Sequence, residues 1–241
     1  MTVPFEFRHA GYCDICEAGV EFVAKQRWFR DHLICPRCHS VPRERALMQV
    51  LKRYYPAYQG LTIHESSPCG RGVSTRLARE CRKYSSSFYF PDKPLGSFDS
   101  KYGASCQSLE ELTYDDASFD LIITQDVMEH VLDPEAAFRE ISRVLKPGGA
   151  HVFTVPLVRK TEASRPRAQR KEDGSIEYLL EKQFHGNPID SSGSLVTMDW
   201  GYDIVRTIMD VSGMPSQIIY TDDIDRGIRA EFIDVVISFR R

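Results

Sequence analysis

Two pairs of cysteines near the N-terminus constrain the fold of this 241-residue chain more than any other feature. Each pair has the spacing C-x2-C, and 18 residues separate the two pairs. Four thiolates at this spacing can surround Zn²⁺ tetrahedrally, which leaves no position open for catalysis. The pattern predicts a structural zinc site formed by Cys13, Cys16, Cys35 and Cys38. His32 and His39 lie close by as alternative ligands.

The segment that carries these cysteines, residues 1–40, is too short to fold on an apolar core of its own. Metal binding would supply the missing free energy of folding. The sequence shows no signal peptide and no run of about 18 apolar residues, so we expect a cytoplasmic protein without a membrane span. Thiols in that compartment stay reduced. The remaining cysteines, Cys69, Cys81 and Cys106, are predicted to be packing residues, with Cys69 set apart by its place in a small-residue loop.

The charge balance limits the classes of partner. The chain has 31 basic and 34 acidic side chains and a net charge of −3, which excludes a protein whose whole surface binds nucleic acid. The total conceals a basic front end and a basic stretch over 159–171. That stretch either clamps a phosphate or carboxylate or forms an exposed lid.

Past residue 40, apolar segments of strand and helix type alternate. Helical periodicity is seen over 46–54, 73–83, 134–145 and 200–211, and short apolar strands are expected over 61–65, 87–90, 119–124, 150–155, 218–221 and 232–239. Asp133 at the N-cap and Pro134 at the first helical position mark one helix start. The last two strands are compatible with an antiparallel pair at a sheet edge. This alternation predicts an α/β fold with a mostly parallel sheet, interrupted by an irregular polar insertion over 157–198.

The block FDLIITQDVMEHVLDPEAAFREISRVLKPGGAHVFTVP, residues 119–156, resembles one strand–helix–strand unit of the class I S-adenosylmethionine-dependent methyltransferases, in the branch called type 11. Weaker similarity runs from about residue 61 to 239. The resemblance implies a transferase with a Rossmann-like, seven-stranded, mostly parallel sheet with an antiparallel edge strand. It implies two domains, a zinc-binding module over 1–40 and a methyltransferase domain over 41–241, in which 157–198 would cover the acceptor site.

The resemblance also implies where S-adenosylmethionine binds. The family's acidic residue and glycine-rich loop correspond to residues 65–72, where Ser66-Ser67-Pro68 replaces the leading glycines. Asp92 is the nearest match to the ribose-binding acid, and Ser108 and Leu109 fall in the adenine-facing loop, although a solvated loop is the alternative for Asp92 and Ser108. Cofactor contacts are thus expected from Glu65, Ser66, Ser67, Gly70, Asp92, Ser108, Leu109, Gln125 and Asp126.

Two histidines are the candidate catalytic residues. His130 follows the strand whose end should face the methyl group, although Glu129-His130 at this place in the family is frequently structural. His185 lies in FHGNPIDSSGSLVTMDWGYD, which resembles a block of a zinc-knuckle subgroup, many of whose members are encoded near glycan-modifying enzymes. Trp200 and Tyr202 either line the acceptor pocket or begin a helix core.

Three functions remain open at this point. The first is an enzyme that methylates an oxygen or nitrogen of a small molecule or sugar. The second is an RNA methyltransferase whose zinc module holds RNA, and the third is a non-catalytic binding module, suggested by the eroded glycine loop. The sequence leaves the acceptor, the need for a general base and the oligomeric state open.

Overall fold

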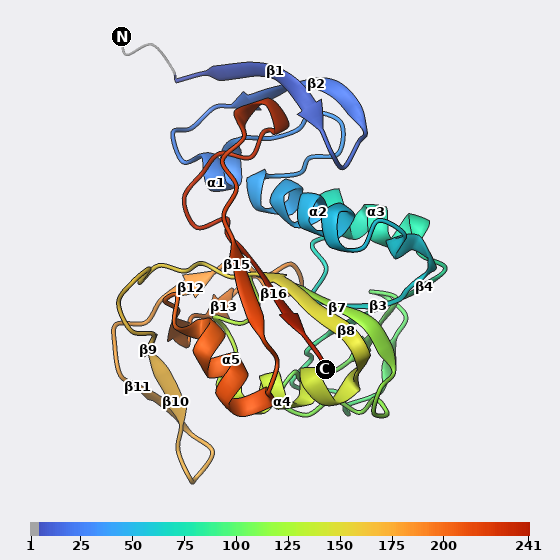
Figure 1. Cartoon of the computed structure of the whole chain (residues 1–241). Coiled ribbons are helices and arrows are strands. Elements are labelled where there is room, and N and C mark those ends of the chain that lie inside the picture. The colour runs from blue at the N-terminus through green and yellow to red at the C-terminus, as the bar shows by residue number, and fades with distance from the viewer. Residues whose placement is uncertain (1–4) are drawn as a thin grey trace.

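A sheet of eight strands forms the centre of the computed structural model, which describes residues 5–241 (Figure 1). The strand order is β15-β16-β8-β7-β3-β4-β6-β5. The bounds are β3 (Thr62–Ser66), β4 (Lys83–Phe88), β5 (Phe98–Asp99), β6 (Ala104–Cys106), β7 (Phe119–Gln125), β8 (Leu145–Thr154), β15 (Ser216–Ile219) and β16 (Val235–Phe239).

Five neighbouring strands, β8, β7, β3, β4 and β6, pair in parallel. The strand β16 is antiparallel to both β8 and β15, and β5 is antiparallel to β6. The predicted α/β fold with antiparallel edge strands is confirmed. The sheet has eight strands rather than seven because the two-residue β5 extends one edge.

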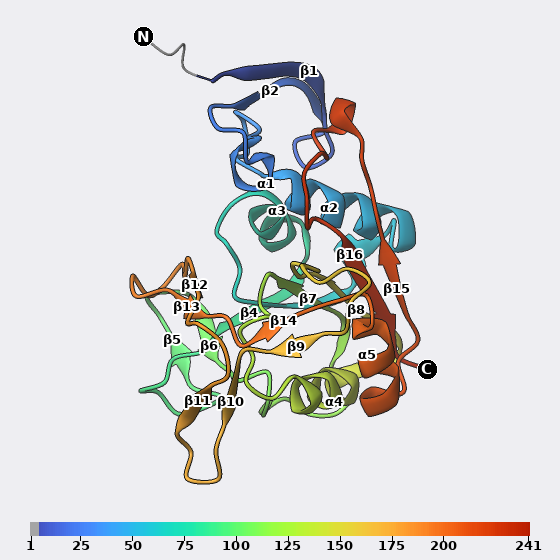
Figure 2. The same cartoon turned by 90° about the vertical axis from the view of Figure 1, so that its left-hand side faces the viewer.

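Helices cover both faces of the sheet (Figures 1 and 2). On one face lie α2 (Pro42–Tyr54) and α3 (Gly72–Glu80), and on the other α4 (Pro134–Val144) and α5 (Ile204–Ser212). Each face has its own apolar core. Leu47, Ile63 and Leu77 belong to the first, and Phe138 and Phe153 to the second.

The start of α4 follows the sequence signals. The carboxylate of Asp133 accepts a 2.9 Å hydrogen bond from the backbone N–H of Ala136, and Pro134 occupies the first turn, where a missing N–H has no consequence. The buried residues of this helix are Ala137, Phe138, Ile141 and Val144, as its periodicity predicts.

The strand β4, which follows α3 in the chain, begins at Lys83, four residues before the predicted start. The helix α3 ends at Glu80 rather than at residue 83. The segment KYSSSF has little apolar character, so its pattern does not indicate a strand. Inside the protein, the hydroxyls of Ser85 and Ser87 each lie 3.0 Å from a ring nitrogen of His64 on β3. These polar contacts stabilise the parallel pair in place of apolar ones.

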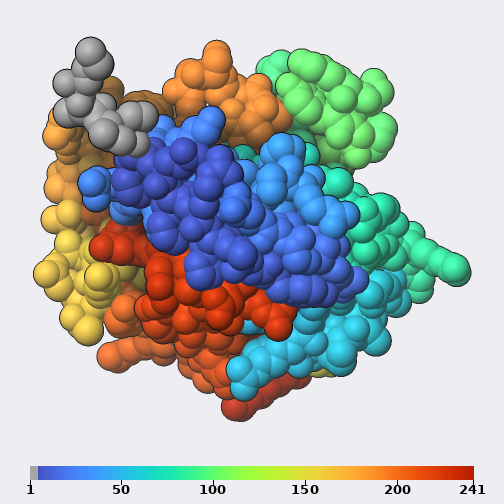
Figure 3. Space-filling view, turned by 90° about the horizontal axis from the view of Figure 1, so that it is seen from above, coloured from blue at the N-terminus to red at the C-terminus, as the bar shows by residue number. Residues whose placement is uncertain are grey.

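The N-terminal region consists of the hairpin β1 (Phe7–Cys13) and β2 (Ala18–Ala24), followed by α1 (Phe29–His32). It packs against a C-terminal turn, η2 (Ile224–Arg226), and Figure 3 shows these two ends of the chain side by side. The buried guanidinium of Arg45 on α2 joins them, because it donates 2.7 Å hydrogen bonds to the carbonyls of Leu33 and Gly227. Leu33, in the N-terminal region, and the buried apolar residues of α2 belong to the same apolar core, which extends across the predicted boundary. The domain boundary at residue 40 stays a prediction.

The insertion over 157–198 is not wholly irregular, because it contains short antiparallel strand pairs. These are β9 (Arg165–Pro166) with β14 (Met198–Asp199), β10 (Ala168–Arg170) with β11 (Ile176–Tyr178), and β12 (Phe184–His185) with β13 (Ser194–Leu195). The basic stretch is largely paired with acids: Arg165 and Arg167 both reach Asp199, at 2.9 and 3.0 Å.

Over residues 5–241, no helix combines the length and apolar character needed to cross a bilayer.

Candidate active site and cysteine cluster

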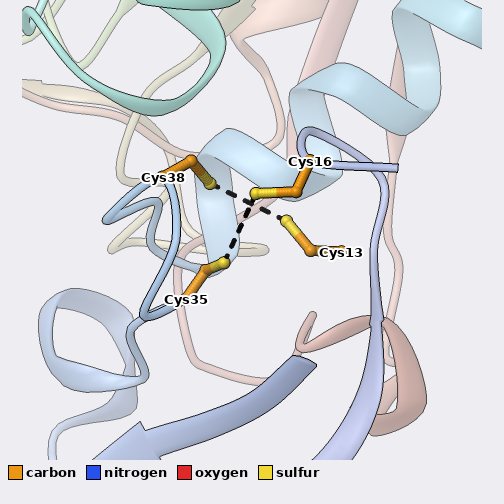
Figure 4. A group of neighbouring side chains, drawn as sticks. All are labelled: Cys13, Cys16, Cys35 and Cys38. Carbon is orange, nitrogen blue, oxygen red and sulfur yellow. Dashed lines mark hydrogen bonds between the residues drawn. The ribbon is translucent and has the colours of Figure 1, made fainter. Parts of the chain in front are cut away.

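The four N-terminal cysteines converge from two turns, one after β1 and one after α1 (Figure 4). The Sγ atoms of Cys13 and Cys38 lie 3.8 Å apart, and those of Cys16 and Cys35 lie 3.7 Å apart. Ligands on a tetrahedral Zn²⁺ with Zn–S bonds of about 2.3 Å are separated by roughly 3.8 Å. Burial raises the pKa of Cys16 to about 12 without a metal. The donor set therefore fits Zn²⁺, which would stabilise the thiolates.

At the carboxyl edge of the sheet, the turn from β3 to α3 has three residues with positive φ: Ser67 at 57°, Gly70 at 66° and Gly72 at 52°. A Cβ added to Gly70 would meet no atom within 4 Å, so the outer side of the turn is open. A Cβ on Gly72 would lie 2.3 Å from a carboxylate oxygen of Glu44 on α2. The inner side of the turn is therefore packed against α2, and only its outer side is free for a ligand.

Glu65, the last residue but one of β3, is completely buried beneath this turn. Its carboxylate accepts hydrogen bonds from Ser74 Oγ at 2.6 Å, Gln125 Nε2 at 2.7 Å and the Tyr84 hydroxyl at 2.8 Å. Burial raises the pKa of Glu65 in spite of these donors. The predicted cofactor residues Glu65 and Gln125 thus contact each other and join β3, α3 and β7 behind the turn.

Cys69 belongs to the same turn. Its thiol donates to Glu44 Oε1 at 3.4 Å, and burial raises its pKa to about 12. A protonated thiol is a poor nucleophile. The predicted packing role is consistent with this geometry.

Asp126 directly follows β7, with φ at 53°. One carboxylate oxygen lies 2.8 Å from both Arg30 Nη2 and Arg43 Nε, and the other accepts a 3.0 Å hydrogen bond from Thr154 Oγ1. Burial opposes ionisation, but the two guanidiniums hold the pKa of Asp126 at about 2. The carboxylate is engaged by the N-terminal region and α2, so its described contacts are structural.

The remaining cofactor predictions fall on loops beside the turn. Ser66 ends β3 as a buried residue, and the Ser67 amide donates to the Ser87 carbonyl at 2.8 Å. Asp92 is exposed, and Leu109 is buried. Ser108 Oγ accepts a hydrogen bond from the Glu110 amide at 3.2 Å. Their roles as cofactor contacts stay predictions.

The two candidate catalytic histidines, 55 positions apart in sequence, lie in contact. The ring centroids of His130 and His185 are 5.1 Å apart with perpendicular planes. Glu129 lies between them, with one carboxylate oxygen 3.8 Å from His130 Nε2 and 3.7 Å from His185 Nδ1. The insertion brings His185 there, because Leu195, on the β13 strand that pairs with β12, accepts a 2.8 Å hydrogen bond from His130 Nδ1.

Two buried carboxylates of this region were not among the predicted site residues. Glu44 is buried on α2 and contacts the turn through Cys69 and Arg71. Glu129 is buried beside both histidines. A sequence signal existed for Glu129, which adjoins His130, whereas Glu44 lies in a helix whose apolar periodicity gives no hint of a role.

A family profile described as a methyltransferase domain matches residues 69–153, from the turn after β3 through most of β8. This segment of the chain is therefore similar to a methyltransferase domain. Within 75 residues the chain is 46% identical to a sarcosine/dimethylglycine N-methyltransferase of Halorhodospira halochloris, covering 31% of this chain and 24% of that protein. Over 49 residues it is 39% identical to a ubiquinone biosynthesis O-methyltransferase of Coxiella burnetii, covering 20% of this chain and 21% of that protein.

Among solved structures, an amino pentose methyltransferase from Micromonospora echinaspora with bound S-adenosylmethionine superposes with a TM-score of 0.51. It is 12% identical, and the match covers 83% of this chain and 92% of that one. This likeness confirms the predicted fold. The chain matches about a quarter or less of the length of the curated relatives named above.

Proposed function

We propose that this protein transfers the methyl group of S-adenosylmethionine to an oxygen or nitrogen of a small molecule or sugar. The observation that carries the proposal is the open turn between β3 and α3 at the carboxyl edge of the sheet, where the match to a methyltransferase domain profile begins. Ligands of open parallel sheets bind at this edge. Gly70 and the small residues beside it permit close approach of the cofactor's methionine part.

The insertion supports an acceptor site over the same edge. Its β12–β13 hairpin contacts the turn after β7 through Leu195, and Ile189 packs against the apolar cluster of Phe88 and Phe90 at the end of β4. Residues 184–195 therefore reach across the ends of three central strands. An acceptor held beneath them would lie beside His130 and His185.

The reaction forms a bond from the acceptor atom to the methyl carbon and breaks the bond from that carbon to sulfur. The electron pair of the broken bond stays on sulfur, and the sulfonium becomes a neutral thioether. Positioning of the two reactants in line supplies much of the rate. An acceptor hydroxyl must also lose a proton, for which the Nε2 lone pair of His130 is available, because its Nδ1–H donates to the Leu195 carbonyl.

We also propose that Cys13, Cys16, Cys35 and Cys38 hold a structural Zn²⁺. The sulfur separations of 3.7 and 3.8 Å support it. The test is Cys35→Ser, which should lose zinc together with folded protein, measured by metal analysis and circular dichroism. The control Cys106→Ala, at a buried cysteine outside the cluster, should keep one zinc per chain. A Cys35→Ser protein that stays folded and loses only activity would refute a structural role.

The ion pairs of the N-terminal region favour a small acceptor over RNA. Arg30 and Arg43 are engaged with Asp126, and Lys52 with Glu17 at 2.6 Å. Cations used in this way are less available for phosphates, which dominate nucleic-acid affinity. Affinity for RNA that falls steeply with salt would instead support the RNA alternative.

The decisive experiment is calorimetry of the zinc-loaded protein with S-adenosylhomocysteine, followed by incubation with labelled S-adenosylmethionine and a panel of amines, hydroxy acids, phenols and aminosugars. One-to-one binding and methyl transfer to a panel member are expected. Absence of cofactor binding would overturn every enzymatic reading. Binding without transfer to any acceptor class, RNA included, would favour a non-catalytic module.

A further inference from the structure

Glu129 is the least satisfied charged residue of the candidate site. Its side chain is 2% exposed, and neither carboxylate oxygen has a hydrogen-bond partner among the residues that the structure describes. Burying a carboxylate without a donor is strongly unfavourable, because it loses water and gains nothing in exchange. A buried carboxyl group in this state indicates a missing partner.

The groups that face Glu129 are metal ligands by type. One atom from each of Glu129, His130 and His185 lies within 4.8 Å of the other two. The nitrogen–oxygen separations are 3.8 Å for His130 and 3.7 Å for His185. These are too long for hydrogen bonds, which range from 2.7 to about 3.2 Å for nitrogen donors. Ligands on a tetrahedral ion with bonds of about 2.1 Å lie roughly 3.4 Å apart, close to the separations seen here.

The tautomer of His130 agrees with metal ligation. Its Nδ1 lies 2.8 Å from the Leu195 carbonyl, which can only accept, so Nδ1 carries the hydrogen and Nε2 presents a lone pair toward Glu129. Metal-bound histidines almost always have their second nitrogen fixed by such a backbone or carboxylate acceptor. A further constraint holds Glu129 itself in place, because its backbone carbonyl accepts from the Thr197 amide at 2.8 Å.

We propose that Glu129, His130 and His185 bind a first-row divalent transition metal ion, at a site separate from the four cysteines. Two imidazoles and one carboxylate suit Mn²⁺, Fe²⁺, Co²⁺ or Zn²⁺ and leave coordination positions open, unlike a closed four-cysteine site. The site joins the turn after β7 to the β12–β13 hairpin, so the ion also fixes the insertion over the sheet edge.

The open positions extend the proposed function, on which this step rests. With the ion bound, Nε2 of His130 would be a ligand and no longer the base. An acceptor hydroxyl at an open position would have a lowered pKa, would release its proton to water instead, and would form the new oxygen–carbon bond as the carbon–sulfur bond breaks. The acceptor class is thereby narrowed to hydroxyl compounds, since a neutral amine needs no deprotonation before attack.

The test is a titration of the full-length protein with Mn²⁺, a poor competitor for thiolates. The protein is first treated with citrate and brought to one zinc per chain, and free Mn²⁺ is followed by electron paramagnetic resonance. Wild type should bind one further equivalent. Glu129→Gln and His185→Gln should each lose this equivalent, and Glu135→Gln, at a 59% exposed carboxylate, should keep it.

Wild type that binds no Mn²⁺, and takes up no second equivalent of Co²⁺ or Zn²⁺, would overturn the metal site whatever the variants do. The same result follows if Glu129→Gln and His185→Gln bind Mn²⁺ as wild type does. Calorimetry with S-adenosylhomocysteine separates the two proposals. Cofactor binding without a second metal removes only the metal site, and a second metal without cofactor binding removes only the proposed methyl transfer.

Discussion

The backbone amide of Gly72 donates a 3.1 Å hydrogen bond to the carbonyl oxygen of Cys38. Gly72 ends the proposed cofactor turn, and Cys38 is one of the four clustered cysteines. Glu44 reinforces the connection, because it contacts Arg71 at 2.9 Å and caps the Val41 amide at the start of α2 at 3.2 Å. The cysteine cluster therefore supports the turn directly, and the two proposed ligand sites are coupled.

This coupling predicts that zinc removal weakens cofactor binding. Stripping the metal with a strong chelator should unfold the region around the cysteines, free Cys38 and loosen the turn, so affinity for S-adenosylhomocysteine should fall at least tenfold in calorimetry. Restoring one equivalent of Zn²⁺ should restore it. Full affinity in a metal-free protein would show that the turn holds its shape without the cluster.

A substitution within the turn tests the same packing. In Gly72→Ala, the added Cβ meets Glu44 and the residue keeps a positive φ, so the free energy of unfolding should drop by about 1–3 kcal/mol and cofactor affinity by about tenfold. The matched control is Gly174→Ala, in the β10–β11 hairpin, where φ is 81° but a Cβ meets nothing within 4 Å. That variant should keep wild-type affinity. Equal affinities in both variants would contradict the placement of the cofactor at this turn.

Asp126 is predicted to stabilise the junction between the N-terminal region and the sheet. Asp126→Asn removes the charge shared by Arg30 and Arg43, whose side chains are only 10% and 14% exposed. Loss of one partner of such a buried group should lower the free energy of unfolding by about 3 kcal/mol in urea titrations. Asp31→Asn removes a 41% exposed partner of the same Arg43 and should lower it by less than about 1 kcal/mol.

Asp126→Asn also distinguishes this structural role from the cofactor contact that the sequence predicted for Asp126. If Asp126 contacted the cofactor, Asp126→Asn would reduce affinity for S-adenosylhomocysteine more than it reduces stability. The acid range offers a second check. Because the pKa of Asp126 is held at about 2, its contribution is complete above pH 4 and is lost only as the pH falls toward 2.

The parts of the fold that were predictable from sequence are those with strong local patterns. The two C-x2-C pairs bring four sulfurs together in the structure, and the block from β7 to β8 has the predicted strand, capped helix and strand. In each case residues close in sequence carry the signal. The polar strand β4 was misplaced because its contacts with His64 are visible only in three dimensions.

The site was less predictable for the same reason. His130 and His185 were chosen separately, and only the fold of the insertion brings them beside Glu129. The partners of Asp126 come from α1 and α2, about 100 and 80 residues earlier in the chain, and carry no motif that links them to β7. The family resemblance predicts which edge of the sheet binds ligands. It does not predict that Arg30 and Arg43 pair with Asp126 at that edge, because these arginines lie in and beside the N-terminal region.

Two buried histidines should make stability depend on pH in the mildly acidic range. Burial lowers the pKa of His64 to about 4 and that of His151 to about 3, while the unfolded value is about 6.5. As the pH falls below 6.5 the unfolded chain takes up protons that the native state refuses, so stability decreases. Each histidine should remove about 1.4 kcal/mol between pH 7.5 and 5.5.

The variant His151→Phe isolates one of these contributions. The phenyl ring can keep the stacking on Phe153, whose ring centroid lies 4.2 Å away, but it cannot titrate. The difference in unfolding free energy between wild type and His151→Phe should therefore shift by about 1.4 kcal/mol, in favour of the variant, from pH 7.5 to 5.5 in urea titrations. Thr124→Val removes the 3.0 Å contact to His151 Nε2 but keeps the imidazole, so it should retain the wild-type pH dependence. Parallel pH profiles for wild type and His151→Phe would mean that the pKa of His151 is the same in the folded and unfolded protein, and would contradict the prediction.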